Sequence, residues 1–125
     1  MKDAATWYGR AVFVGIAVNL FLSVPGMFWP NGVLDLVGSP PSNTPVWPAG
    51  ASLLLTLLSL FYIPGALDPY RYKWTAILTL FARFSGATFF LVIWAGRFPL
   101  IGWIDLFFLI VQAPLLYLTY RRQPA

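Results

Sequence analysis

Four apolar stretches, each close to the length of a membrane-spanning helix, make up most of this 125-residue chain. A helix that crosses the hydrocarbon core of a bilayer needs about 20 mostly apolar residues, because each residue adds about 1.5 Å along the helix axis. The pattern therefore predicts an all-α fold, an integral membrane four-helix bundle formed as a single domain by residues 1–125. The expected helices are Ala11–Phe28, Pro48–Leu67, Thr75–Ala95 and Ile101–Tyr120.

The segment between the first two apolar stretches, residues 29–47, is the only sizeable loop, and we expect it on the outer side of the membrane. Its second half, residues 38–45, consists of Gly, Ser, Pro, Asn and Thr, which are typical of turns. Residues 32–37 are too apolar to lie free in water. We therefore expect a short helix there in the membrane interface, with Asn31 as its N-cap.

Basic residues outside the apolar stretches predict the orientation in the membrane. Six of them flank the termini and the link between the second and third stretches: Lys2, Arg10, Arg71, Lys73, Arg121 and Arg122. The other side carries only Arg97. By the positive-inside rule, both termini are expected in the cytoplasm. Topology and anionic lipids thus account for the net charge of +4, and no nucleic-acid partner is expected.

Aromatic residues are expected at the two membrane interfaces, where an amphipathic ring meets lipid headgroups. On the cytoplasmic side these are Trp7, Tyr8, Tyr62, Tyr70, Tyr72, Trp74, Tyr117 and Tyr120. On the opposite side they are Phe28, Trp29, Trp47, Trp94 and Trp103. The two groups support the same topology as the basic residues.

Three residue types that often act in catalysis or bind metals are missing from the chain, which has no Cys, no His and no Glu. Their absence removes disulfides, zinc sites, iron–sulfur ligation and the usual haem ligands. It also removes histidine general-base chemistry and any Ser-His or Cys-His nucleophile. The carboxylates are Asp3, Asp35, Asp68 and Asp105. We therefore predict no catalytic residue, no metal site and no cofactor, and a protein that is not an enzyme.

Arg83 is the residue that most needs a partner, because an Arg near the middle of a membrane costs at least about 2.5–3.5 kcal/mol to insert. It lies about 12 Å from the cytoplasmic start of its helix if each residue rises about 1.5 Å. The same count places Asn19, Ser59 and Gln112 of the other three helices near that depth. We therefore predict an interior polar layer in which Arg83 donates to amide and hydroxyl oxygens.

Asp105 is expected about 10 Å from the level of Arg83, towards the outer side, by the same rise per residue. That separation is long for a direct salt bridge, although the two side chains could point towards each other. A water or a polar group of a ligand could lie between them. A carboxylate near a helix N-terminus also complements the helix dipole. For the layer itself three roles stay open: hydrogen bonds that set the helix register, a binding site, and a proton or ion path.

Several short motifs occur in a familiar order along the chain. They are FWP at residues 28–30, VWPAG at 46–50, LDPYR at 67–71, FARFSG at 81–86 and an Asp at 105. In this order the chain resembles the DoxX-like proteins and related small four-helix bacterial membrane proteins of unknown function. The resemblance implies a four-helix bundle in a bacterial inner membrane more than an activity, although some DoxX-like proteins are linked to quinol-oxidising complexes.

Two functions from different classes are consistent with these residues. The first is a non-enzymatic accessory subunit that packs against a larger membrane complex, bioenergetic by analogy, or against further copies of itself. Eleven Phe and six Trp would supply surface for such neighbours. The alternative is a membrane binding protein for a small amphiphile (a quinone, an isoprenoid or another lipid), with a pocket between the helices lined by Asn19, Arg83, Asp105 and Gln112.

Overall fold

The structure, a computed structural model, describes residues 3–95 and 99–121. Its helices are α1 (Ala4–Phe28), α2 (Pro30–Leu36), α3 (Val46–Phe61), α4 (Ile63–Leu67), α5 (Lys73–Thr88), the π-helical η1 (Phe89–Ile93) and α6 (Pro99–Arg121). Four helical segments are long and apolar enough to cross a membrane: α1, α3 with α4, α5 with η1, and α6. The prediction of an all-α membrane four-helix bundle is therefore confirmed. The cytoplasmic placement of the termini stays a prediction, and Lys2, Arg97 and Arg122 lie outside the described residues.

Three of the four spans differ in their details from the predicted helices. The first begins at Ala4 rather than at residue 11, because Asp3 caps it by accepting a hydrogen bond from the Thr6 N–H at 2.9 Å. That bond holds the pKa of the Asp3 carboxyl below its usual value. The second span is interrupted at Tyr62, two residues before Pro64, whose ring nitrogen cannot donate to the preceding turn. The third ends in the π-helical turn η1.

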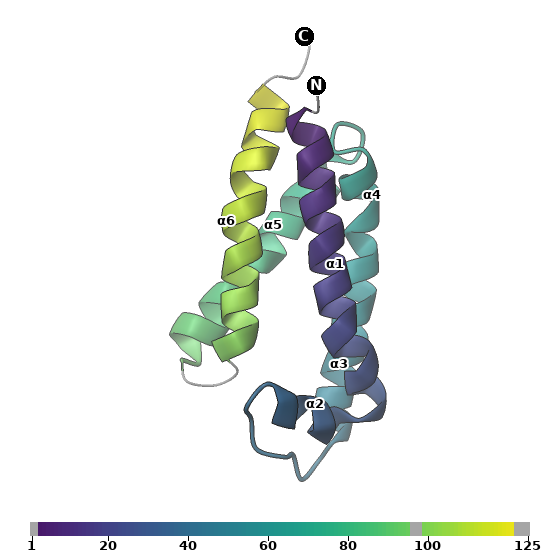
Figure 1. Cartoon of the computed structure of the whole chain (residues 1–125), viewed down its shortest axis with the longest axis vertical. Helices are drawn as coiled ribbons and strands as arrows, with labels where there is room; N and C mark the ends of the chain where they lie inside the picture. Colours follow the sequence, from purple (N-terminus) through teal and green to yellow (C-terminus); the bar gives the residue numbers. More distant parts are fainter. Residues whose placement is uncertain (1–2, 96–98, 122–125) are drawn as a thin grey trace.

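Helix α1 holds the bundle together, since it packs against α3, α4 and α6, while α5 packs against α6 and α4. The start of α1 and the end of α6 lie at the same end of the bundle, which we call the terminal end (Figure 1). The opposite end, which carries α2 and η1, we call the loop end. Figure 1 shows that the pair α1–α3 and the pair α5–α6 lie close together at the terminal end and diverge towards the loop end.

Close backbone contacts hold the terminal end together. A Cβ on Gly9 would lie 2.5 Å from the Ala66 carbonyl oxygen, and a Cβ on Gly65 would lie 2.8 Å from the Ala76 nitrogen. The Tyr8 hydroxyl donates to the Ala76 carbonyl at 3.2 Å. Small residues thus let α1, α4 and α5 approach closely, as is common between membrane helices.

The predicted cytoplasmic aromatic belt contains two residues that belong elsewhere. Tyr8 and Tyr62 are buried inside the bundle, whereas Trp7, Trp74 and Tyr117 are exposed on its outer surface. The prediction was wrong for Tyr8 and Tyr62 because it considered their depth in the membrane and not the helix face on which they lie.

The outward surface of the four spans is apolar. Exposed residues occur on every span and include Phe21, Leu54, Phe61, Leu78, Phe81 and Ile110. The most deeply buried side chains are instead largely polar or charged, among them Asn19, Ser59, Arg83 and Gln112. This distribution suits a protein whose solvent is hydrocarbon, because polar groups must then find partners inside the bundle.

The segment between α1 and α3 folds back over the loop end. Helix α2 packs against both α1 and α3, close to the predicted position. Asn31 is not its N-cap, because Pro30 already occupies the first turn and favours that position. The Asn31 amide instead bridges the loop: its oxygen accepts from the Ser42 N–H at 2.8 Å, and its nitrogen donates to the Ser42 carbonyl at 3.4 Å.

Candidate functional site

Arg83 of α5 occupies the centre of the polar interior, with only 2% of its surface exposed. Its Nη1 donates to Asp105 Oδ1 of α6 at 2.8 Å and to Asn19 Oδ1 of α1 at 3.2 Å. The expectation that Arg83 and Asp105 are too far apart for a direct salt bridge was therefore wrong. Charge-assisted hydrogen bonds of this length are among the stronger ones in proteins.

Two structural features explain why Arg83 and Asp105 lie closer together than the count along ideal α-helices indicated. The π-helical turn η1 lies between Arg83 and the link to α6, and such a turn is wider and rises less per residue than an α-helix. In addition, Gly86 follows Arg83 by about one turn, and a Cβ at Gly86 would overlap the Asp105 carboxylate. The glycine thus allows α6 to bring Asp105 next to the guanidinium.

Asn19 extends the network to a fourth helix. Its Nδ2 donates to Ser59 Oγ of α3 at 3.0 Å, and Ser59 Oγ donates to the Leu55 carbonyl of its own helix at 2.8 Å. The chain Asp105–Arg83–Asn19–Ser59 therefore contains one residue from each membrane span. Four of the five residues that the sequence analysis singled out are joined by direct hydrogen bonds.

Gln112, the fifth residue, lies in the same region but outside this chain of hydrogen bonds. It is fully buried, and neither polar atom of its side chain has a hydrogen-bond partner among the described residues. A Cβ on Gly15 would lie 2.6 Å from Arg83 Nη2 and 3.5 Å from Gln112 Nε2, so both groups border the same glycine. Arg83 Nε and Nη2 also have no partner within the described part of the chain.

Aromatic rings supply part of the environment of the guanidinium. Arg83 Cζ lies 4.8 Å from the centroid of the Phe108 ring and 5.8 Å from that of the Tyr62 ring. Cation–π attraction at such distances is worth about 0.5–2 kcal/mol and increases when the cation is desolvated. The two rings therefore compensate in part for the unused donors of Arg83.

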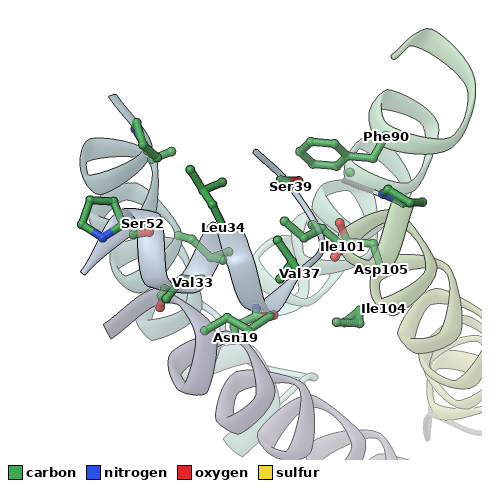
Figure 2. Close-up of a pocket in the computed structure, with 18 of the residues that line it drawn as sticks. Asn19, Val33, Leu34, Val37, Ser39, Ser52, Phe90, Ile101, Ile104 and Asp105 are labelled. Carbon is green, nitrogen blue, oxygen red and sulfur yellow. The ribbon is translucent and has the colours of Figure 1, made fainter. Parts of the chain in front are cut away.

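A cavity of about 940 Å³ lies on the loop-end side of this network. Asn19, Tyr62, Arg83 and Asp105 form its polar side next to the network, and four serines (Ser23, Ser39, Ser42 and Ser52) also line it. The rest of its wall is mostly apolar and comes from α2, α3, η1 and α6. In Figure 2, Ser52 of α3 lies on the left, Ile101, Ile104 and Asp105 of α6 lie on the right, and Leu34 of α2 lies between them, with Asn19 of α1 below it. The cavity thus lies where the two helix pairs diverge.

Tyr62 is a cavity residue that the sequence analysis missed. It is 4% exposed and lines the cavity, and its hydroxyl makes no hydrogen bond with any residue that the structure describes. The signal that could have found it is its spacing, since it follows Ser59 by three residues and so lies on the same helix face.

The charges that line the cavity cancel. Among the described residues that line it, Arg83 is the one cation and Asp105 the one anion, and they are paired with each other. The described part of the site therefore offers hydrogen-bonding groups in a mostly apolar, partly open pocket and carries no net charge.

No family model, curated protein or solved structure matches the chain. The resemblance to DoxX-like proteins therefore stays a prediction, and arguments about function depend on the site itself.

Proposed function

We propose that this protein is a membrane binding protein for a small amphiphile (a quinone, an isoprenoid or another lipid), which places its polar head near Arg83 and Asp105 and its apolar part in the cavity. The observation that supports this function is that the salt bridge borders a cavity of about 940 Å³, and that its Asp105 carboxylate keeps 16% of its side chain exposed. Pockets for small ligands typically measure about 300–1,000 Å³ and combine apolar walls with a few polar groups.

A purely structural role for the polar layer explains less of the arrangement. Hydrogen bonds that set the helix register need only join the helices, and the bond between Asn19 and Ser59 already does this for α1 and α3. Register-setting does not require Asp105 to keep 16% of its side chain exposed at a cavity. A ligand that occupies the cavity would use that exposed carboxylate and would restore close packing between the helix pairs.

The accessory-subunit hypothesis predicts a different use of the same protein. The exposed apolar side chains of the four spans suit neighbouring helices, but they suit lipid acyl chains equally well. They favour neither function, whereas the cavity favours binding. We therefore retain packing against a larger complex, or against further copies, as the outcome that the following experiment would reveal if the proposal is wrong.

The proposal is tested by purifying the tagged protein in a mild detergent and identifying the lipids and proteins that accompany it by mass spectrometry. Ile104→Trp would fill the cavity from α6, because Ile104 is one of its lining residues. Ile110→Trp is the matched control, since Ile110 lies on the same helix and is 62% exposed on the outer surface.

We expect one lipid species in near-stoichiometric amount with the wild-type protein and with Ile110→Trp, and its loss from Ile104→Trp. Lipids that mirror the bulk membrane in all three samples would contradict the proposal. A stoichiometric protein partner without an enriched lipid would replace it with the accessory-subunit function.

A further inference from the structure

We infer, building on the proposed function, that the cavity selects an uncharged lipid whose head carries a hydroxyl group, bound by the Tyr62 hydroxyl and the free carboxylate oxygen of Asp105. The inference follows from the polar groups that the helices leave unused at the cavity. It also depends on the charge that the cavity presents and on the composition of its walls.

Most polar groups of the network around Arg83 are already engaged. Arg83 Nη1 donates to Asp105 and Asn19, and the Asn19 amide nitrogen donates to Ser59. Arg83 Nε and Nη2 have no hydrogen-bond partner in the part of the chain that the structure describes, but they are enclosed by protein atoms. The accessible hydrogen-bonding capacity beside the salt bridge therefore has to come from other atoms.

Two groups beside the salt bridge retain such capacity. The Tyr62 hydroxyl makes no hydrogen bond within the described residues, although the side chain is 96% buried and lines the cavity. Asp105 Oδ1 accepts from Arg83, while no described residue donates to Asp105 Oδ2. Neither atom is enclosed in the way that Arg83 Nε is. One open donor and one open acceptor thus flank the same guanidinium.

A hydroxyl group matches this pair because it donates and accepts at once. Its hydrogen can bond to the carboxylate oxygen of Asp105, and its own oxygen can accept from Tyr62. A head with acceptors alone, such as an ester, would exclude water from the cavity and donate no hydrogen bond to Asp105 Oδ2. An unsatisfied buried carboxylate oxygen is unfavourable, so such a head should bind more weakly.

The charge of the site disfavours ionised heads. The described residues of the cavity lining include one cation and one anion, which already form a salt bridge. A carboxylate or phosphate head would lie beside Asp105, while Arg83, the one cation among the described lining residues, is committed to that carboxylate. An ammonium head would in the same way lie beside Arg83. In an apolar enclosure such like-charge contacts are strongly unfavourable, and a neutral head avoids both.

The remaining wall suits the tail of such a lipid. Val33, Leu34 and Val37 of the α2 segment and Ile101 and Ile104 of α6 line the cavity, and Figure 2 shows them around the same space. No charged side chain other than Arg83 and Asp105 lies among the described residues that line it. A neutral lipid also partitions into the bilayer, so it would be concentrated around the diverging helix pairs next to the cavity.

The test uses three probes with an identical chain and different heads: oleyl alcohol, methyl oleate and oleate. Binding to the delipidated, detergent-solubilised full-length protein is measured by native mass spectrometry at several probe concentrations. For the wild-type protein we expect oleyl alcohol to bind best, with methyl oleate and oleate each weaker by about tenfold. Equal binding of all three probes would overturn the inference on head chemistry while leaving the proposed function intact. Binding of none of them, together with no lipid in the native preparation, would overturn both.

Two variants assign the effect to the two groups. Tyr62→Phe should weaken oleyl alcohol binding by about three- to tenfold, as expected for one lost hydrogen bond. Its control is Tyr117→Phe, which removes a hydroxyl from an exposed ring outside the cavity lining and should change nothing. Asp105→Asn removes the anion and should reverse the order, so that oleate binds best. If both cavity variants still prefer oleyl alcohol as the wild-type protein does, the inference is contradicted. If Asp105→Asn does not fold, the binding of oleyl alcohol to Tyr62→Phe alone tests the inference.

Discussion

Gly86 of α5 faces the carboxylate of Asp105 of α6 so closely that a Cβ at position 86 would overlap Asp105 Oδ2. The absence of a side chain at this position is therefore what allows Arg83 and Asp105 to pair. The relationship links a residue that looks like a packing glycine in the sequence to the charged centre of the bundle. A substitution at Gly86 is therefore a direct way to separate the charges of Arg83 and Asp105 without altering either residue.

Gly86→Ala should therefore destabilise the bundle. The added methyl group displaces Asp105 and leaves Arg83 as a buried cation without its anion, which typically lowers the free energy of unfolding by about 3 kcal/mol or more. Unfolding in mixed detergent micelles, followed by far-ultraviolet circular dichroism, measures the change. Gly50→Ala is the control, because a Cβ at Gly50 meets nothing within 4 Å. Equal stability of the two variants would show that the carboxylate moves aside without leaving Arg83.

Asn19 and Ser59 should be energetically coupled. Their hydrogen bond joins α1 to α3, and such bonds between membrane helices contribute about 0.6 kcal/mol on average and up to about 1.7 kcal/mol. A double-mutant cycle with Asn19→Ala and Ser59→Ala isolates this coupling from the separate loss of the bond between Asn19 and Arg83. We expect a coupling energy of about 1 kcal/mol. Strictly additive effects would mean that the bond does not persist in detergent or in lipid.

Gln112→Leu should leave the free energy of unfolding unchanged or raise it by about 1 kcal/mol. The amide is fully buried without a partner among the described residues, and replacing an unsatisfied polar group by an apolar one of similar size removes a desolvation penalty. Arg83→Leu, which removes a paired charge from the same layer, provides the contrast and should be strongly destabilising. A loss of more than about 1 kcal/mol on Gln112→Leu would show that the amide pairs with the guanidinium.

The loop over the cavity should depend on Asn31. Its side chain makes two hydrogen bonds to the backbone of Ser42, and Asn31→Ala removes both. We expect faster backbone amide hydrogen exchange in residues 39–44 and unchanged exchange in α5 and α6. Asn43→Ala is the matched control, because Asn43 is exposed in the same loop and its side chain makes no hydrogen bond with the described residues. Unchanged exchange in Asn31→Ala would mean that packing of α2 alone holds the loop.

The residues of the polar layer could be predicted because each is expensive to place in hydrocarbon. Asn19, Ser59, Arg83 and Gln112 stand out against apolar neighbours, and counting along the helices placed them near one depth. The direct salt bridge could not be predicted in the same way. The count assumed ideal α-helices, whereas η1 is π-helical and Gly86 permits an unusually close approach of α6.

Tyr62 shows the other limit of this reasoning. Depth alone placed it with the interfacial aromatic residues, but its helix face turns it towards the cavity. The cavity itself arises because the pair α1–α3 diverges from the pair α5–α6, which Figure 1 shows and no local pattern encodes.

The sequence by itself determined the fold class and the number of spans. Backbone groups in hydrocarbon must be satisfied within each segment, so the length and composition of a segment suffice to make it a spanning helix. Which polar groups meet, and which stay open towards a cavity, was decided only by the tertiary structure. Those outcomes depend on the tilt of whole helices and on glycines at their crossings, because a hydrogen bond forms only within a few tenths of an ångström of its ideal length.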